Sequence, residues 1–168
     1  MQKVKVFRAR GFRALFLTLA VLLAGAIFFM SGEPAAESGA RSSTLAESIV
    51  KLFDPGFASL SEAEQTLMLS SADLVLRKAA HFCVYAALGA LLFLYSLCFA
   101  AKPWAHILRA LLAAAVYAAS DEIHQSFVPG RGPAVTDVLL DSAGALCGIL
   151  AIWLLVWASC RRKKQPLQ

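Results

Sequence analysis

The chain has 168 residues, of which 59% are hydrophobic and 16% are charged, and its mean hydropathy is +0.66. This composition excludes a typical soluble domain and favours an integral membrane protein surrounded by the lipid bilayer. The net charge of +5 does not indicate a nucleic-acid partner, because the basic residues gather near the chain ends instead of forming one face. We therefore expect an all-α membrane domain and no nucleic acid.

Four apolar stretches have about the length that a helix needs to cross a bilayer, roughly 20 residues. They are Ala14–Met30, Ala79–Ala101, Trp104–Ala119 and Val138–Ala158. The third is short and borrows the polar run 121–125 as its end. Taken alone, that stretch is also consistent with a buried helix of a soluble core. The four stretches together predict a polytopic bundle with four transmembrane helices.

The basic residues predict the orientation of this bundle. Eleven of them precede the first stretch, flank the turn after the second or follow the fourth: Lys3, Lys5, Arg8, Arg10, Arg13, Lys102, Arg109, Arg161, Arg162, Lys163 and Lys164. Four spans would place all of these on one side, which the positive-inside rule makes the cytoplasm. We therefore expect a basic cytoplasmic N-terminus (1–13), one membrane domain (14–158) with an external loop (31–78), and a basic cytoplasmic tail (159–168).

The first apolar stretch has a second interpretation, because a basic segment before an apolar run is also typical of a cleaved secretory signal. This run is 17 residues long, whereas the apolar core of a signal peptide spans about 7 to 15 residues. No clear cleavage motif of small residues follows Met30. We therefore expect an uncleaved anchor.

The external loop is expected to contain two amphipathic helices. Ser42, Ser43 or Thr44 can cap a first helix that ends near Phe53, after a loop that includes 37–39. Ser61, followed three residues later by Glu64, forms a capping box for a second helix. That helix is expected to run into the second span. Segments of this kind lie in the membrane interface or cover the end of a bundle.

The polar residues near the third and fourth stretches follow helical spacing. Tyr117, Asp121, His124 and Gln125 continue the stripe Ala110, Ala114 and Ala118, with Glu122 at its edge. In the next helix one face carries Asp137, Asp141, Gly144 and Gly148, so the two acids lead into a GxxxG contact surface. Both stripes are expected to turn inward, toward each other.

These residues predict a polar cluster at the external end of the bundle. Arg77, His81 and Tyr85 follow i, i+4 spacing at the start of the second span. The full polar cluster consists of Arg77, Lys78, His81, Tyr85, Asp121, Glu122, His124, Gln125, Arg131, Asp137 and Asp141. Its three bases and four acids nearly cancel, which favours a network of ion pairs, because an unpaired charge in a poorly solvated place is costly.

Three kinds of chemistry are open to the polar cluster. His81, His124 and a carboxylate of Asp121 or Glu122 could bind zinc, and the same four residues are the candidates for acid–base hydrolysis of a lipid-linked substrate. Neither possibility has an established motif, so we expect no metal and no other cofactor. The third is recognition of an anionic lipid or a peptidoglycan precursor by Arg77, Lys78 and Arg131. We favour this binding role, combined with a structural one.

The motifs resemble the VanZ-like family of small bacterial membrane proteins. The resemblance lies in Arg-Lys-x-x-His-x-x-x-Tyr-x-x-Leu-Gly (Arg77–Gly89), Asp-Glu-x-His-Gln-x-Phe-Val-Pro-Gly-Arg (Asp121–Arg131), Asp137, Gly144–Gly148 and Ser31. It implies a multi-pass protein of the bacterial cytoplasmic membrane. The family's namesake is linked to low-level resistance to the glycopeptide teicoplanin, which implies a role in the cell envelope. Many members have Asn where this chain has Asp141, so a role that needs a neutral amide there does not carry over.

Overall fold

The described part of the chain is all-α, as the sequence predicts. The structure is a computed structural model that describes residues 10–162, apart from the side chains of residues 36, 41, 160 and 162. Its elements are α2 (Arg10–Ser31), α3 (Ala35–Phe53), the 3₁₀ turn η1 (Phe57–Ser59), α4 (Glu62–Leu97), α5 (Pro103–Gln125) and α6 (Val135–Arg162). The expected chain ends 1–9 and 163–168, with five of the eleven basic residues, lie outside the described residues.

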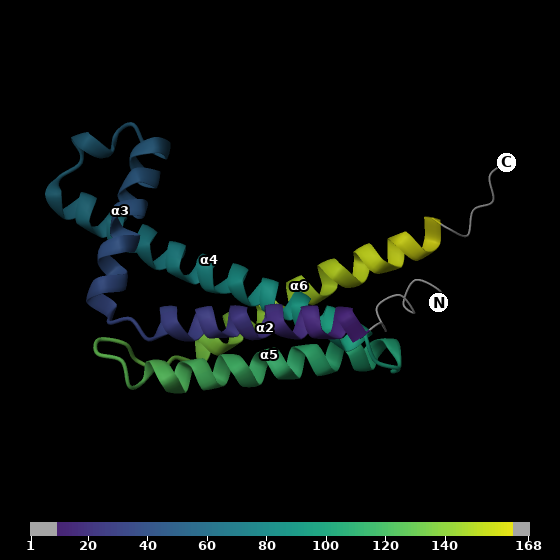
Figure 1. Ribbon diagram of the computed structural model, residues 1–168. Coiled ribbons are helices and arrows are strands. Elements are labelled where there is room, and N and C mark those ends of the chain that lie inside the picture. The colour runs from purple at the N-terminus through teal and green to yellow at the C-terminus, as the bar shows by residue number, and fades with distance from the viewer. Residues whose placement is uncertain (1–9, 163–168) are drawn as a thin grey trace.

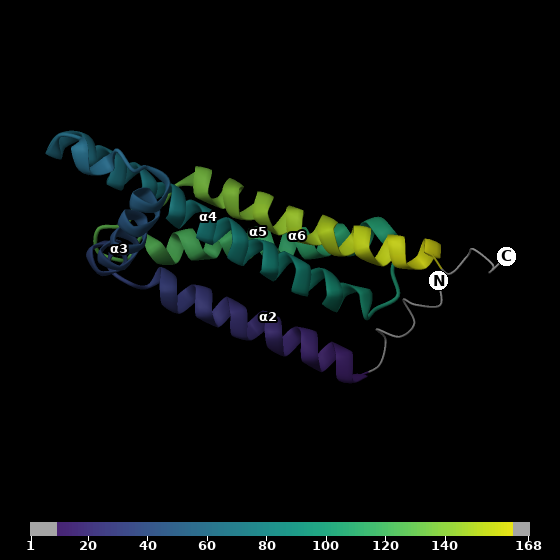
Figure 2. The same cartoon turned by 90° about the horizontal axis from the view of Figure 1, so that it is seen from above.

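Four helices form an elongated bundle, and a helical arm projects from one end of it (Figure 1). α4, α5 and α6 run alternately up and down, and α2 lies along the same bundle. The start of α2 and the end of α6 lie at the end of the bundle that is remote from the arm (Figures 1 and 2). The arm consists of α3, η1 and the first turns of α4.

Three helices among the described residues are long and apolar enough to cross a membrane: α2, α4 and α6. This agrees with three of the four expected spans. α5 does not meet the same criterion; its sequence includes the polar residues His106, Arg109 and Asp121. The stripe of alanines on α5 is nevertheless buried as expected, with Ala114 and Ala118 at 0% exposure. The fourth span therefore stays a prediction.

The glycines of α6 bring it into backbone contact with α4, and the contact between these two helices is the most extensive in the bundle. A Cβ atom at Gly144 would collide with the backbone of Phe82, and one at Gly148 would collide with the backbone of Ala86. A Cβ atom at Gly89 of α4 would likewise collide with the backbone of Ala145 of α6. The predicted GxxxG surface is therefore a helix contact, and its partner is α4.

The arm differs from expectation in its first helix. α3 begins at Ala35, directly after Pro34, so residues 37–39 are helical and the three expected caps lie inside the helix. The hydroxyl of Ser42 donates to the Ser38 carbonyl at 2.9 Å, because a serine within a helix can bond to the preceding turn. The second helix is as predicted: Ser61 and Glu64 form a capping box, and α4 continues unbroken for 36 residues into the bundle.

Candidate functional site

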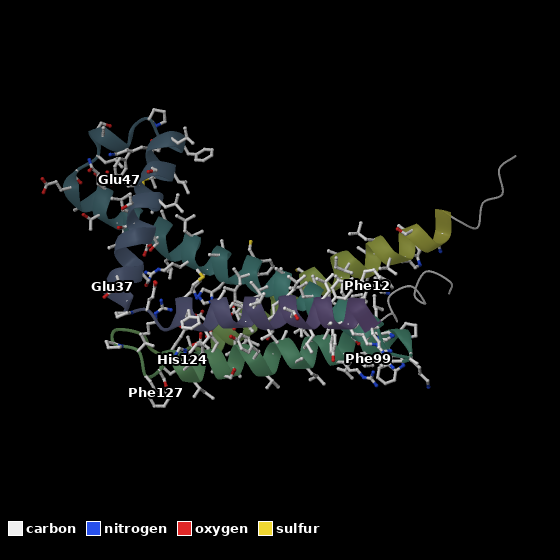
Figure 3. All side chains as sticks on the ribbon, viewed as in Figure 1. Phe12, Glu37, Glu47, Phe99, His124 and Phe127 are labelled. Carbon is white, nitrogen blue, oxygen red and sulfur yellow. The ribbon has the colours of Figure 1, made fainter. Side chains whose placement is uncertain are left out.

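The polar cluster lies at the end of the bundle that carries the arm. The ends of α2 and α5, the start of α6 and the middle of α4 meet there. In Figure 3, His124 and Phe127 lie at this end, and Phe12 and Phe99 lie at the other. The polar residues that the sequence places on separate helices therefore share one end of the molecule.

Asp121 is the centre of a buried hydrogen-bonded group. Its Oδ2 accepts a hydrogen bond from Ser31 Oγ at 2.9 Å and another from Gln125 Nε2 at 3.0 Å. Asp121 is 3% exposed, Ser31 2% and Gln125 8%. Ser31 ends α2, so this group joins α2 to α5. Asp121 and Gln125 of the α5 stripe thus contact α2, a partner that the sequence did not predict.

Arg131 extends this group toward the arm. Its Nη1 donates to Gln125 Oε1 at 3.3 Å, and its Nη2 donates to Ser38 Oγ of α3 at 3.2 Å. Arg131 lies in the loop 126–134 between α5 and α6, and two features hold this loop in place. Gly130 has a φ of 77°, which suits glycine, and the Ala35 amide donates a hydrogen bond to the Pro129 carbonyl at 3.2 Å. Burial lowers the pKa of the half-buried Arg131 guanidinium. An arginine nevertheless stays protonated in proteins.

The acids of α6 pair with bases of α4. Lys78 forms an ion pair with Asp137, and His81 Nδ1 lies 3.5 Å from Asp141 Oδ2. Asp137 and Asp141 precede Gly144 and Gly148 on the same face of α6. That face therefore forms both the two pairs and the glycine contact with α4. Arg77 pairs with Asp73 at 2.6 Å. The expected network of ion pairs therefore separates into local pairs, and no described carboxylate lies within 4.0 Å of Arg131.

Glu122 and His124 occupy different surroundings from those that a joint catalytic or metal site requires. Glu122 Oε2 accepts a hydrogen bond at 2.8 Å from the amide of Ala134, directly before α6. This contact ties the end of α5 to the start of α6. The ring of His124 stacks on Phe28 at 4.0 Å between centroids. Among the described residues, no group of three His, Cys, Asp or Glu side chains is arranged to hold a metal ion.

Several buried polar atoms of the cluster have no hydrogen-bond partner within the described chain. They are Tyr85 Oη, Asp121 Oδ1, His124 Nδ1 and both carboxylate oxygens of Asp141. A small cavity of about 40 Å³ adjoins Tyr85, and its other lining residues are Ser31, His81, Ile27, Met30, Ala80 and Val84. The lining of this cavity is mostly apolar, and its volume is large enough for a group the size of a water molecule. The cluster therefore offers hydrogen-bonding capacity beyond what the chain itself uses.

Two polar side chains in these contacts were missed by the sequence reasoning. Asp73 is 9% exposed and lies one helical turn before Arg77, so its i, i+4 spacing was a signal that could have found it. Ser38 contacts Arg131 across 93 residues of sequence, and no local pattern predicts that contact. Both residues belong to the loop between the first two expected spans, which therefore contributes side chains to the site.

The fold and the site together define an α-helical membrane protein with a polar cluster at one end of its bundle. The family model described as VanZ/LLP1 matches residues 16–156, which is most of the chain. The chain therefore belongs to the VanZ/LLP1 family, as its motifs indicate. The comparisons with curated proteins and with solved structures gave no match.

Proposed function

We propose that the protein crosses the bacterial cytoplasmic membrane four times, with both termini in the cytoplasm and the polar cluster outside. The fourth span would be α5, whose 23 residues are long enough to cross the apolar layer at about 1.5 Å per residue. Arg10, Arg13, Lys102, Arg109 and Arg161 belong to parts of the chain near the end remote from the arm. Charge asymmetry of this kind supports a cytoplasmic position for that end.

Reporter fusions test this topology directly. Fusions after Pro34 and Gly130, on the two loops beside the arm, should give an external signal. Fusions after Pro103 and Gln168 should give a cytoplasmic signal, because the intervening helices would each cross the membrane. A phosphatase active only outside and a fluorescent protein active only inside provide complementary readings at each position. A cytoplasmic signal at Gly130 combined with one at Pro103 would contradict α5 as a span.

We propose further that the polar cluster binds an anionic component of the envelope, with Arg131 as its anchor. The carrying observation is the contrast between its bases: Arg77 and Lys78 pair with acids, whereas Arg131 is held by the neutral side chains of Gln125 and Ser38. A guanidinium has five N–H donors in a planar fork that matches phosphate and carboxylate groups. Held in this way, Arg131 keeps its charge and part of its donor capacity for a ligand.

The ligand class follows from this anchor and its surroundings. An anionic lipid head group and a peptidoglycan precursor both present phosphate at the membrane surface, and both would meet Arg131 at the outer end of the bundle. Asp121 Oδ1 and the carboxylate of Asp141, which has an ion pair with His81 but no hydrogen bond, are buried in the same cluster and suit hydroxyl or amine donors of such a ligand. A role in tolerance of glycopeptide antibiotics would be a consequence of this binding.

Replacing Arg131 should weaken binding of a polyprenyl diphosphate, the anionic anchor of such precursors. Loss of hydrogen bonds to a charged group costs about 1.5–3 kcal/mol, so Arg131→Ala should raise Kd by about ten- to a hundredfold. The measurement is a titration of the full chain in phosphatidylcholine nanodiscs. Lys51→Ala is the matched control, because Lys51 is an exposed base of α3 that pairs with Glu47. Its Kd should not change.

Two further variants keep this experiment decisive. Arg131→Lys retains the charge and loses the planar fork, so its affinity should fall between those of the parent and Arg131→Ala. Ser38→Ala removes one neutral partner of Arg131 and should weaken binding less than loss of the arginine itself. A folded Arg131→Ala protein with unchanged affinity would contradict the anchor. If Arg131→Ala does not fold, the test is Arg131→Lys: an affinity equal to that of the parent would contradict the role of the Arg131 guanidinium as the anchor.

Catalysis by the cluster has less support from the same contacts. An acid–base pair on α5 would need the His124 imidazole beside a carboxylate such as that of Asp121. Asp121 Oδ2 instead bonds to Ser31 and Gln125, and His124 stacks on Phe28. The histidine nearest a carboxylate is His81, beside Asp141. Binding therefore uses the observed arrangement as it stands, whereas acid–base catalysis by His124 and Asp121 would require other pairings.

A further inference from the structure

A second polar feature lies at the end of the bundle remote from the polar cluster. A cleft of about 320 Å³ opens between α4 and α5, and its lining includes Leu92, Tyr95, Ser96, Phe99, Arg109 and Ala113. In Figure 3, Phe99 marks this end, opposite His124. The volume falls within the range of small-molecule sites, about 300–1,000 Å³. Most of the lining is apolar, and Arg109 is its charged member.

A second arginine, Arg13 of α2, contacts one of the residues that line the cleft. The guanidinium carbon of Arg13 lies 4.9 Å from the centre of the Phe99 ring, and Phe99 lines the cleft. The Nε atom of Arg13 is buried and has no hydrogen-bond partner among the described residues. A buried donor of a charged group without an acceptor is costly. An acceptor beside Phe99 would therefore stabilise Arg13.

No Asp or Glu side chain of the sequence belongs to this end of the bundle. No Asp or Glu occurs in residues 1–32, 74–120 or 142–168, which include all of the bundle apart from the end with the polar cluster. Neither Arg13 nor Arg109 has a described carboxylate within 4.0 Å. Arg109 is exposed, so an anion from outside the chain can reach it.

We propose that this cleft binds an anionic phospholipid of the membrane leaflet at that end. Its phosphate would be held by Arg13 and Arg109, and one acyl chain would lie along Leu92 and the aromatic rings of the cleft. The apolar lining favours a lipid over a soluble anion, and basic pockets between membrane helices are known to take anionic head groups. Ser96, whose Oγ lies 3.0 Å from His106 Nδ1, adds a hydroxyl to the lining near the ester groups.

The test is retention of phosphatidylglycerol by the full chain, measured by native mass spectrometry from nanodiscs that contain equal amounts of phosphatidylglycerol and phosphatidylcholine. The parent should retain phosphatidylglycerol in preference to phosphatidylcholine. Arg109→Gln should lower this preference at least severalfold. Lys102→Gln is the matched control, because Lys102 is an exposed base at the same end that does not line the cleft. It should leave the preference unchanged.

A cleft-filling variant separates the cleft from charge alone. Ala113→Phe keeps both arginines and occupies the lining, so it should also reduce retention. If Lys102→Gln and Arg109→Gln reduce the preference for phosphatidylglycerol equally, the lipid is attracted non-specifically and the proposal is wrong. If folded Ala113→Phe retains as much phosphatidylglycerol as the parent, the lipid does not bind in this cleft. If inorganic phosphate stabilises the detergent-solubilised protein as strongly as phosphatidylglycerol does, the cleft binds an anion and not a lipid, which would contradict the proposal. If Arg109→Gln does not fold, Arg13→Gln takes its place in the comparison.

Discussion

Alanine at both Gly144 and Gly148 should cause the largest loss of folded protein among single-site or paired changes in the bundle. Each added Cβ would meet backbone of α4, at Phe82 and Ala86, and a backbone cannot move aside as a flexible side chain can. Overpacking costs about 1–3 kcal/mol at each position. The helices must separate, which also disturbs the pairs Lys78–Asp137 and His81–Asp141 along the same contact.

The measurement is the monodisperse yield and thermal unfolding of the purified protein in one detergent. Gly25→Ala is the matched control, because Gly25 also lies within a helix and a Cβ there would meet nothing within 4 Å. Alanine favours a helix by up to about 1 kcal/mol relative to glycine, so this control should unfold at the same temperature as the parent or higher. An unchanged unfolding temperature for the double variant would contradict the close contact of α4 and α6.

The glycine contact shows how far the sequence could predict the fold. Apolar length and the spacing of Gly144 and Gly148 indicate membrane helices and a contact face, because both are local properties of one helix. The partner of that face is not a local property. It depends on which helix brings its backbone close, here α4 at Phe82 and Ala86. The expected pairing with α5 was therefore wrong, although the face itself was identified.

The polar cluster was predictable to the same extent. Burial of charge beside apolar stretches indicates its members, and the structure brings them to one end of the bundle. Partner choice depends on loop geometry, which residues 126–134 set through Gly130 and the bond between Ala35 and Pro129. With that geometry, Arg131 donates a hydrogen bond to Ser38, and Asp137 forms its ion pair with Lys78 instead of with Arg131. Charge counting assumes that opposite charges pair, and it cannot distinguish Arg131 from the paired bases.

Asp121→Ala should cause the second large effect, a fall of roughly 5–15 °C in the unfolding temperature. The change removes the acceptor of two buried donors, Ser31 Oγ and Gln125 Nε2. Each orphaned donor costs about 1–3 kcal/mol, and each kcal/mol lowers the midpoint by about 2–4 °C in a chain of this size. The contact between the ends of α2 and α5 would loosen, and Gln125 would then hold Arg131 less firmly.

Asp121→Asn separates the hydrogen bonds from the charge. Both bonds end on the single atom Oδ2, and the carbonyl oxygen of asparagine can accept both. This variant should therefore keep most of the parent's stability, because burying a neutral amide is less costly than burying a carboxylate. Asp137→Ala is the control on the other side of the cluster: its ion pair with Lys78 is partly exposed, at 36% and 41%, and such pairs contribute only about 0–1 kcal/mol. If Asp121→Asn proves as unstable as Asp121→Ala, the negative charge of Asp121, and not its bonds to Ser31 and Gln125, holds this end of the bundle together.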